Sequence, residues 1–262
     1  MATYLDRILA AHRTAAAADE RDLDDLLARA ASMPPARGFT AALAAVDPAE
    51  HGIGVIAEVK RRSPSKGDLA ADLDPAVLAR QYADGGANCL SVLTDVDFFG
   101  GSSADLAVAR SACSLPVLRK DFTVSAHDVA DARLMGADCL LLIAAALAPT
   151  DLTHLHALAV DLGLDVLVEI HDESELDAAL AAGAALVGVN QRDLVTFAVD
   201  HERAVRMGGV IPADVVAVAE SGVRGPDDAR SLAAAGYRAV LVGESLVTSA
   251  DPTVAVSALR RT

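Results

Sequence analysis

The sequence has few aromatic residues, and this scarcity limits the folds open to it. Aromatic residues make up 3% of the 262 residues and Trp is absent, whereas 53% of the residues are hydrophobic. A large core is therefore available, but it must be filled by Ala, Val, Leu and Ile. Layered aliphatic packing of this kind fits an α/β barrel better than an aromatic-rich β-sandwich, and the chain has the length of such a barrel.

Basic residues are also scarce. Lys and Arg together number 22 against 37 Asp plus Glu, which gives a net charge of −15. A field of that sign repels nucleic acids and anionic membranes, so we expect neither as a partner. A local group of cations can still bind a small anionic substrate.

Long apolar runs and paired cysteines are missing as well. The most apolar segment, residues 139–148, has ten residues and is too short to cross a bilayer. The N-terminal residues carry charges and lack a continuous apolar stretch, so we expect no signal peptide. Cys89, Cys113 and Cys139 show no metal-ligand spacing and are expected to be free thiols. These features predict a cytoplasmic protein.

Short apolar segments alternate regularly with longer amphipathic ones. Successive segments begin 20 to 34 residues apart, which leaves room each time for one helix and two loops. This alternation predicts a parallel sheet with right-handed crossovers. Eight units favour a closed (β/α)8 TIM barrel, because the open doubly wound alternative requires a G-x-G-x-x-G fingerprint that is absent. The expected strands are Val55–Val59, Cys89–Leu93, Val117–Arg119, Cys139–Ile143, Val166–Glu169, Leu186–Val189, Val215–Ala219 and Ala239–Val242.

Capping residues and glycines mark the helix boundaries. Ser125 with Asp128, and Asp172 with Glu175, have the spacing of a capping box. An aspartate or glycine before proline marks further helix starts. Glycines that mark helix ends shortly before the next strand are Gly86, Gly136, Gly163, Gly183 and Gly236.

Residues 1–50 lie outside the alternation and are rich in alanine. We expect one or two helices here, separated at Ser32–Gly38, as an N-terminal helical extension packed on the barrel. The whole chain, residues 1–262, is expected to be a single barrel domain.

Polar residues gather at the C-terminal ends of the expected strands, where the catalytic groups of a (β/α)8 barrel lie. Glu58 and Lys60 are two residues apart and point to one face of the first strand. A single charge at a strand end is usually only solvated, but the pattern recurs at nearly every strand and predicts an active site. The residues at these ends are Glu58, Lys60, Thr94, Asp95, Lys120, Asp121, Glu169, Asn190, Gln191, Arg192, Glu220, Ser221, Gly243 and Glu244.

Glycine-containing loops follow the last two strands. Residues 219–222 and 242–246 each bring glycine to the barrel mouth, where backbone N–H groups can approach an anion. A short helix is expected to begin near Glu244. The loops predict a phosphate site.

Metal and nucleophile motifs are not evident. His154 and His156 are two apart on an expected helix and face different directions, and His171 beside Asp172 is typical of a helix start. No G-x-S-x-G elbow is present. We expect no metal site.

Several longer motifs occur in order from about Ile53 to the C-terminus. They are "IAEVKRRSPSKG", "SVLTDVDFFGGS", "PVLRKDF", "DVLVEIHDESEL", "VNQRDLVTFAVD", "AESGV" and "VGESLV". Together they resemble the indole-3-glycerol phosphate synthase family of tryptophan biosynthesis. The resemblance implies closure of 1-(2-carboxyphenylamino)-1-deoxyribulose 5-phosphate to an indole, with loss of carbon dioxide and water and without a cofactor. We expect a monomer.

The resemblance also implies roles for the residues at the strand ends. Lys120 resembles the general acid that protonates the ribulose carbonyl, Lys60 the contact to the substrate carboxylate, and Glu169 the acid/base group of dehydration. Glu58 and Asn190 would hold lysines and substrate hydroxyls in place. Further charge, substrate contacts and the phosphate cradle would come from Glu220, Ser63, Arg192, Ser221, Gly222 and Gly243.

Two positions differ from the commonest form of the family motifs. Gln191 stands where Asn is common, and Glu244 stands where Ser also occurs. A carboxylate beside phosphate would repel it, so we expect Glu244 to turn outward and leave its backbone N–H for the anion. The loop Arg61–Gly67 is expected to be a flap over the substrate.

Two other interpretations remain open from the sequence. Phosphoribosylanthranilate isomerase and the tryptophan synthase α subunit would share the late glycine loops but not "EVKRRSPSKG" with "LRKDF". A catalytically silent barrel is expected to have lost Lys60, Lys120 or Glu169, and all three are present.

Overall fold

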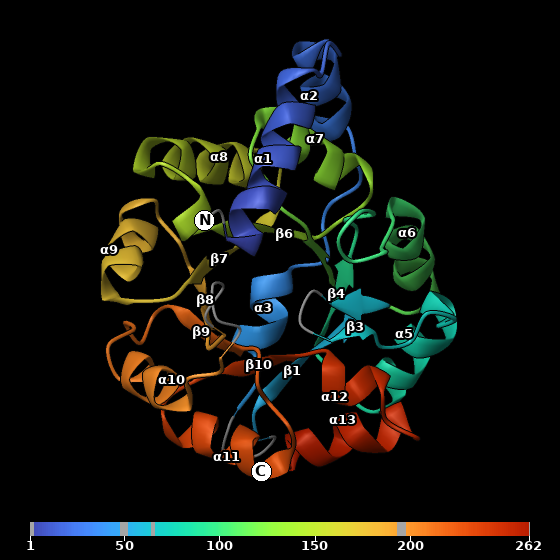
Figure 1. Ribbon diagram of the computed structural model, residues 1–262, viewed down its shortest axis with the longest axis vertical. Helices are drawn as coiled ribbons and strands as arrows, with labels where there is room; N and C mark the ends of the chain where they lie inside the picture. Colours follow the sequence, from blue (N-terminus) through green and yellow to red (C-terminus); the bar gives the residue numbers. More distant parts are fainter. Residues whose placement is uncertain (1–2, 48–51, 64–65, 193–197, 262) are drawn as a thin grey trace.

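The computed structural model describes residues 3–47, 52–63, 66–192 and 198–261. Within these residues, eight parallel strands close into a barrel in the order β1-β10-β9-β8-β7-β6-β5-β4 (Figure 1). Their bounds are β1 Gly54–Val59, β4 Cys89–Leu93, β5 Val117–Lys120, β6 Cys139–Ile143, β7 Asp165–Ile170, β8 Leu186–Asn190, β9 Val216–Glu220 and β10 Ala239–Val242. The predicted (β/α)8 barrel is confirmed, and each predicted strand end lies within one residue of the observed one.

Helices surround the barrel and shield the outer faces of its strands (Figure 1). The outer helices are α5 Pro75–Asp84, α6 Ser103–Ala112, α7 Ala126–Leu134, α8 Pro149–Asp161, α9 Glu173–Ala181, α10 His201–Gly208, α11 Pro226–Ala234 and α13 Pro252–Arg260. Two short helices, η1 Ala144–Ala146 and α12 Glu244–Val247, follow β6 and β10 directly. The expected helix start near Glu244 is confirmed.

The capping predictions are mostly confirmed. Ser125 and Asp128 form the expected capping box at the start of α7. Asp172 caps α9 through the backbone N–H of Glu175, but the carboxylate of Glu175 accepts from the N–H of His171 instead of Asp172. The prediction of a second capping box is therefore wrong, because the Glu175 carboxylate binds the N–H of the residue before the N-cap. The glycines expected at helix ends have positive φ, as a helix C-terminus that turns into a strand requires.

The N-terminal extension contains one helix more than expected. Its described part has three helices, α1 Tyr4–Ala17, α2 Leu23–Ala31 and α3 Phe39–Ala44, so the expectation of one or two is wrong. The break at Ser32–Gly38 is confirmed between α2 and α3. A six-residue helix shows too little periodicity to stand out in a sequence. In Figure 1, α1 and α2 lie at one side of the ring and α3 lies over its centre.

Helix α3 closes the N-terminal end of the barrel. Phe39 and Leu43 are fully buried and join the cluster of inward-facing residues that includes Ile56 and Leu118. The backbone N–H of Thr40 donates to the carboxylate of Asp165 at the start of β7 (2.9 Å). Helix α3 thus covers the aliphatic interior at the N-terminal ends of the strands, and the C-terminal ends are where a substrate can enter.

The two cysteines predicted in strands are buried free thiols, and Cys113 is free and partly buried. His156 is buried in α8 whereas His154 is exposed, so the two histidines do face different directions. None of the described helices is long and apolar enough to span a membrane.

Candidate active site

A cavity of about 680 Å³ opens at the C-terminal ends of the strands. Helix α1 contributes Tyr4, Leu5 and Ile8 to its wall, so the extension shapes the mouth as well as the closed end. The twelve residues to which the family resemblance gave a role all line this cavity, whereas the strand-end residues Thr94, Asp95 and Gln191 do not. The twelve are Glu58, Lys60, Ser63, Lys120, Glu169, Asn190, Arg192, Glu220, Ser221, Gly222, Gly243 and Glu244.

The lysines of the chain are concentrated in this cavity. The sequence contains three lysines, Lys60, Lys66 and Lys120, and every one lines the cavity. In a chain of net charge −15, this places the ammonium groups where an anionic substrate would bind. The scarcity of lysine was a signal in the sequence that the motif analysis missed.

Lys120 lies at the centre of the polar layer. It ends β5, and its Nζ donates to Oε2 of Glu169 (3.0 Å) and to Oε2 of Glu220 (2.9 Å). Asn190 donates from Nδ2 to the other oxygen of Glu169 (3.0 Å). Burial disfavours the ammonium form, but the two carboxylates outweigh it and raise the pKa of Lys120 well above its usual range. Lys120 is therefore charged.

The two carboxyl groups beside Lys120 differ in protonation. Burial raises the pKa of each, but at Glu169 the charges of Lys120 and His171 and the bond from Asn190 outweigh it and lower the pKa to about 2. At Glu220, burial exceeds the attraction of Lys120, and the pKa rises to about 7. Oε1 of Glu220 accepts no hydrogen bond from a described residue. The site thus holds an ionised carboxylate and a carboxyl that keeps a proton near neutral pH.

Glu58 and Lys60 form a second ion pair on the wall of the cavity. Nζ of Lys60 lies 2.5 Å from Oε1 of Glu58, which confirms that the two side chains share one face. Ser91 donates to the other oxygen of Glu58 (3.3 Å), and the hydroxyl of Tyr82 donates to its backbone carbonyl (3.2 Å). Glu58 is 3% exposed, so these contacts hold a buried carboxylate that orients Lys60.

The glycine loops that follow β9 and β10 line the cavity beside the end of β1. Gly243 lies beside the Glu58–Lys60 ion pair, and a Cβ added there would overlap Oε1 of Glu58 and lie 2.9 Å from Nζ of Lys60, so only glycine allows this approach. Ser221 and Gly222 both have positive φ, 66° and 72°. No hydrogen bond from the N–H groups of Ser221, Gly222 or Glu244 to a described residue is found. The Glu244 side chain is 43% exposed and 3.7 Å from Nζ of Lys66.

The loop after β1 crosses the same side of the mouth. Ser63 lies in a short hairpin formed by β2 Arg62–Ser63 and β3 Gly67–Asp68, and its hydroxyl is buried without a partner among the described residues. Arg61 points away from the cavity and binds Asp105 of α6 (2.9 Å). Residues 64–65 of the expected flap lie outside the described residues.

His171 is a neighbour of the site that the sequence analysis assigned only to a helix start. Its Nδ1 lies 3.2 Å from Oε2 of Glu175, and its Nε2 lies 4.0 Å from Oε1 of Glu169. Burial opposes the charged ring, but Glu175 and Glu169 outweigh it and raise the pKa of His171. The interval of one residue between Glu169 and His171 could have suggested that both face the barrel mouth.

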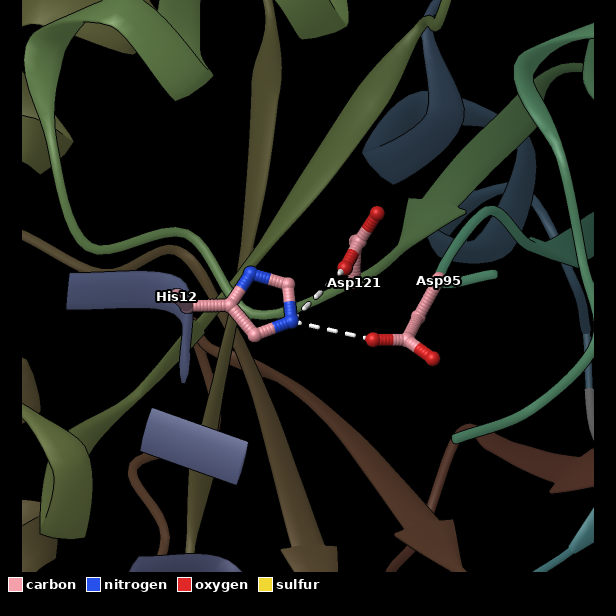
Figure 2. A group of neighbouring side chains, drawn as sticks. All are labelled: His12, Asp95 and Asp121. Carbon is pink, nitrogen blue, oxygen red and sulfur yellow. Dashed lines mark hydrogen bonds and ion pairs between the residues drawn. The ribbon is translucent and has the colours of Figure 1, made fainter. Parts of the chain in front are cut away.

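A further cluster joins the extension to the barrel, and we call His12, Asp95 and Asp121 the His12 clasp. Figure 2 shows the His12 ring of α1 pointing at the two carboxylates, 3.0 Å from Oδ2 of Asp95 and 3.8 Å from Oδ1 of Asp121. Burial disfavours the imidazolium form, but both carboxylates outweigh it and raise the pKa of His12. The partners lie far apart in the sequence, so the clasp could not be predicted.

The atoms of the clasp could in principle hold a cation, since they lie within 4.8 Å of one another. The carboxylate of Asp121 is already engaged, because Oδ2 accepts from Thr94 (2.5 Å) and Arg119 (3.1 Å) and Oδ1 from the N–H of Phe122 (2.8 Å). The Arg119 guanidinium already balances the charge of Asp121, which favours a hydrogen-bonded link over a metal centre.

Comparison with known proteins identifies a family. The family model described as "Indole-3-glycerol phosphate synthase" matches residues 5–259. A protein of that name from Nocardioides is 52% identical over 260 residues, covering 97% of this chain and 96% of its own. "Indole-3-glycerol phosphate synthase 2" of Streptomyces coelicolor is 54% identical over 230 residues, covering 88% and 87%.

Solved structures agree on the fold. A thiamine phosphate pyrophosphorylase from Pyrococcus furiosus superposes with a TM-score of 0.60 at 15% identity, covering 80% of this chain and 94% of that one. At this identity the likeness concerns the barrel alone.

Proposed function

The chain belongs to the indole-3-glycerol phosphate synthase family and carries that carboxy-lyase activity in tryptophan biosynthesis, and we propose which of its residues perform the reaction. The family acts on a phosphorylated substrate. In the proposed reaction the substrate is 1-(2-carboxyphenylamino)-1-deoxyribulose 5-phosphate, whose aromatic carbon attacks the ribulose carbonyl. Carbon dioxide is then lost, and the departure of water completes the indole.

Lys120 is the general acid of ring closure. The attack turns the carbonyl oxygen into an alkoxide, which needs a proton as it forms. The observation that carries the proposal is the position of Nζ between Glu169 and Glu220, 3.0 and 2.9 Å away, which keeps the ammonium protonated inside a buried site. A positioned acid of this kind contributes about 10²–10⁴ to the rate.

Lys60 orients the substrate carboxylate. Its ammonium is held by Glu58 at the wall of the cavity and can pair with a second anion. Carbon dioxide leaves as a neutral molecule, so the interaction must hold the carboxylate in position without trapping it. Glu58 shares the lysine charge with the substrate and moderates this attraction.

Glu169 and Glu220 divide the proton transfers of dehydration. The hydroxyl formed in ring closure must leave as water, which requires a proton donor, and the ring system must lose a proton, which requires a base. Glu220 has its pKa raised to about 7 and supplies the donor. Glu169 has its pKa lowered to about 2 and is the base, with Asn190 fixing its orientation.

The phosphate end lies against the glycine loops. The N–H groups of Ser221, Gly222 and Gly243, together with that of Glu244, form the proposed cradle. Ser63 and Arg192 are the proposed side-chain contacts, since both line the same cavity. Lys66 approaches the Glu244 carboxylate and reduces its repulsion of the phosphate.

We also propose that the chain, residues 1–262, is a single domain that acts as a cytoplasmic monomer without a cofactor. A mass of 26.8 kDa by light scattering is the expected result for the monomer. Turnover that survives exhaustive dialysis against a chelator is expected if no metal is needed.

Incubation with the carboxyphenylamino-deoxyribulose phosphate tests the proposed reaction. The expected result is the growth of indole fluorescence with release of one carbon dioxide per product. Folded protein that produces neither signal would contradict the assignment. Phosphoribosylanthranilate should remain unchanged under the same conditions, because its isomerisation requires a different constellation of residues.

A further inference from the structure

Ser221 has an unusual backbone conformation. Among the described residues it is the non-glycine residue with positive φ, 66°, and Gly222 follows with a φ of 72°. A left-handed serine costs about 1–2 kcal/mol, so neighbouring groups must hold it. The strained pair directly follows β9, at the place where we propose that the substrate phosphate binds.

Gln191 holds this turn from the neighbouring strand. It directly follows β8 and is fully buried, and its Nε2 donates to the carbonyl oxygen of Ser221 (3.0 Å). Its backbone N–H donates to the carbonyl of Glu220 (3.0 Å). One residue therefore binds two successive carbonyls at the end of β9. The side-chain bond fixes the peptide plane that carries the N–H of Gly222, and the backbone bond fixes the plane that carries the N–H of Ser221.

His201 orients the amide of Gln191. Nδ1 of His201 lies 2.8 Å from Oε1 of Gln191, so Nδ1 carries the proton and donates. The carbonyl of Gln191 accepts from the N–H of Asp200 (2.9 Å), which ties the start of α10 to the same residue. His201 also lines the cavity, and a Cβ added to Gly222 would lie 3.4 Å from its Cε1. We call the chain of hydrogen bonds from His201 of α10 through the Gln191 amide to the Ser221 carbonyl the Gln191 relay.

We propose that Gln191 and His201 are positioning residues for phosphate: they hold Ser221 and Gly222 in the left-handed turn, so that the N–H groups face the anion before it arrives. The proposal rests on the proposed phosphate end of the cavity. Its ligand class is a phosphate monoester. The amide of Gln191 itself bonds only to protein groups and does not touch the substrate.

Substitutions of Gln191 test the relay. Gln191→Asn keeps the amide but shortens the side chain by one methylene, so in this chain it cannot reach both His201 and Ser221, which are spaced for glutamine. Gln191→Leu keeps the bulk and removes both side-chain bonds. We expect KM for the phosphorylated substrate and the inhibition constant of inorganic phosphate to rise in parallel, on the order of tenfold, with kcat within about threefold of the parent. Gln81→Leu changes the other glutamine of the chain, in α5, and is the matched control.

A glycine at position 221 distinguishes positioning from general disruption. Ser221→Gly adopts positive φ without strain, so in the Gln191→Leu background it should restore most of the phosphate affinity. A loss of folding in both Gln191 variants could not be rescued by this substitution. Failure of Ser221→Gly to improve phosphate binding would overturn the proposal, as would a fall in kcat with unchanged phosphate inhibition.

A substrate analogue without the phosphate separates this inference from the proposed function. The parent protein is expected to bind the phosphorylated compound much more tightly than the analogue, and the Gln191 variants should narrow that difference. If the parent has no such preference, the phosphate end itself is misassigned. If the parent prefers phosphate and the Gln191 variants retain the full preference, the phosphate end stands and the relay is refuted.

Discussion

Replacing Lys120 by methionine removes the charge between Glu169 and Glu220 and keeps the length of the side chain. The contact of 3.0 Å with the ionised Glu169 contributes roughly 5 kcal/mol of attraction at an effective dielectric constant of about 20. The contact with Glu220 contributes less, because that carboxyl keeps a proton near neutral pH. The variant lacks the proposed acid, so kcat should fall by at least about 10²–10⁴. It also leaves two buried carboxyl groups without a cation.

The stability of this variant should depend on pH in a defined direction. Without Lys120, burial raises the pKa of both Glu169 and Glu220 above the unfolded value of about 4.5. Groups with raised folded-state pKa stabilise the protein below the unfolded value, and that stability is lost as the pH rises through the folded value. The variant should therefore be more stable at pH 5 than at pH 8. At pH 8, breaking the buried pair costs about 3–5 kcal/mol, on the order of 10 °C in Tm.

The assays are indole fluorescence for turnover and thermal unfolding followed by circular dichroism at the two pH values. Lys66→Met is the matched control, because Lys66 is 55% exposed and its single ion pair at 3.7 Å should contribute less than about 1 kcal/mol. Turnover of Lys120→Met within tenfold of the parent would refute its role as the acid. A Tm deficit that is equal at pH 5 and pH 8 would refute the electrostatic account.

Three further predictions concern the packing around the site. A Cβ added by Gly188→Ala would overlap Oε1 of Glu220, so we expect turnover to fall at least about tenfold with folding retained; normal turnover would show that Glu220 can move without consequence. Burial opposes protonation of His12, but Asp95 outweighs it and raises the pKa of His12. The ion pair with Asp95 therefore stabilises the folded protein below pH 6.5, and this stabilisation is lost as the pH rises above that value. His12→Ala should flatten the dependence of Tm on pH between 6 and 8, and an unchanged profile would contradict this. Phe39→Ala should cost about 3–5 kcal/mol in urea unfolding, and a loss below 1 kcal/mol would mean that α3 does not seal the barrel.

The barrel could be predicted because its strands are buried on both sides. A segment such as Cys139–Ile143 is continuously apolar and stands out from the amphipathic helices on either side. The polar ends could be predicted for a related reason, since a charge that interrupts an apolar segment is unusual. Glu58 and Glu169 are both 3% exposed, which is what their apolar surroundings in the sequence suggested.

Features that depend on distant partners could not be predicted. The His12 clasp joins His12 to two aspartates that are more than eighty positions away in the sequence, and no local pattern connects them. The different protonation of Glu169 and Glu220 also depends on the fold, because it follows from which carboxyl receives the bond from Asn190 and the charge of His171. Both carboxyl groups look alike in the sequence.

The distribution of lysine has a practical consequence for chemical conjugation. Acylating reagents and aldehyde linkers react with primary amines, and apart from the α-amino group this chain offers them only Lys60, Lys66 and Lys120. Among the lysines, Lys66, with 55% of its side chain exposed, would react first, at the rim of the catalytic cavity. Attachment to a support through lysine would therefore block the mouth of the barrel. Linkage through the abundant surface carboxylates would leave the mouth open.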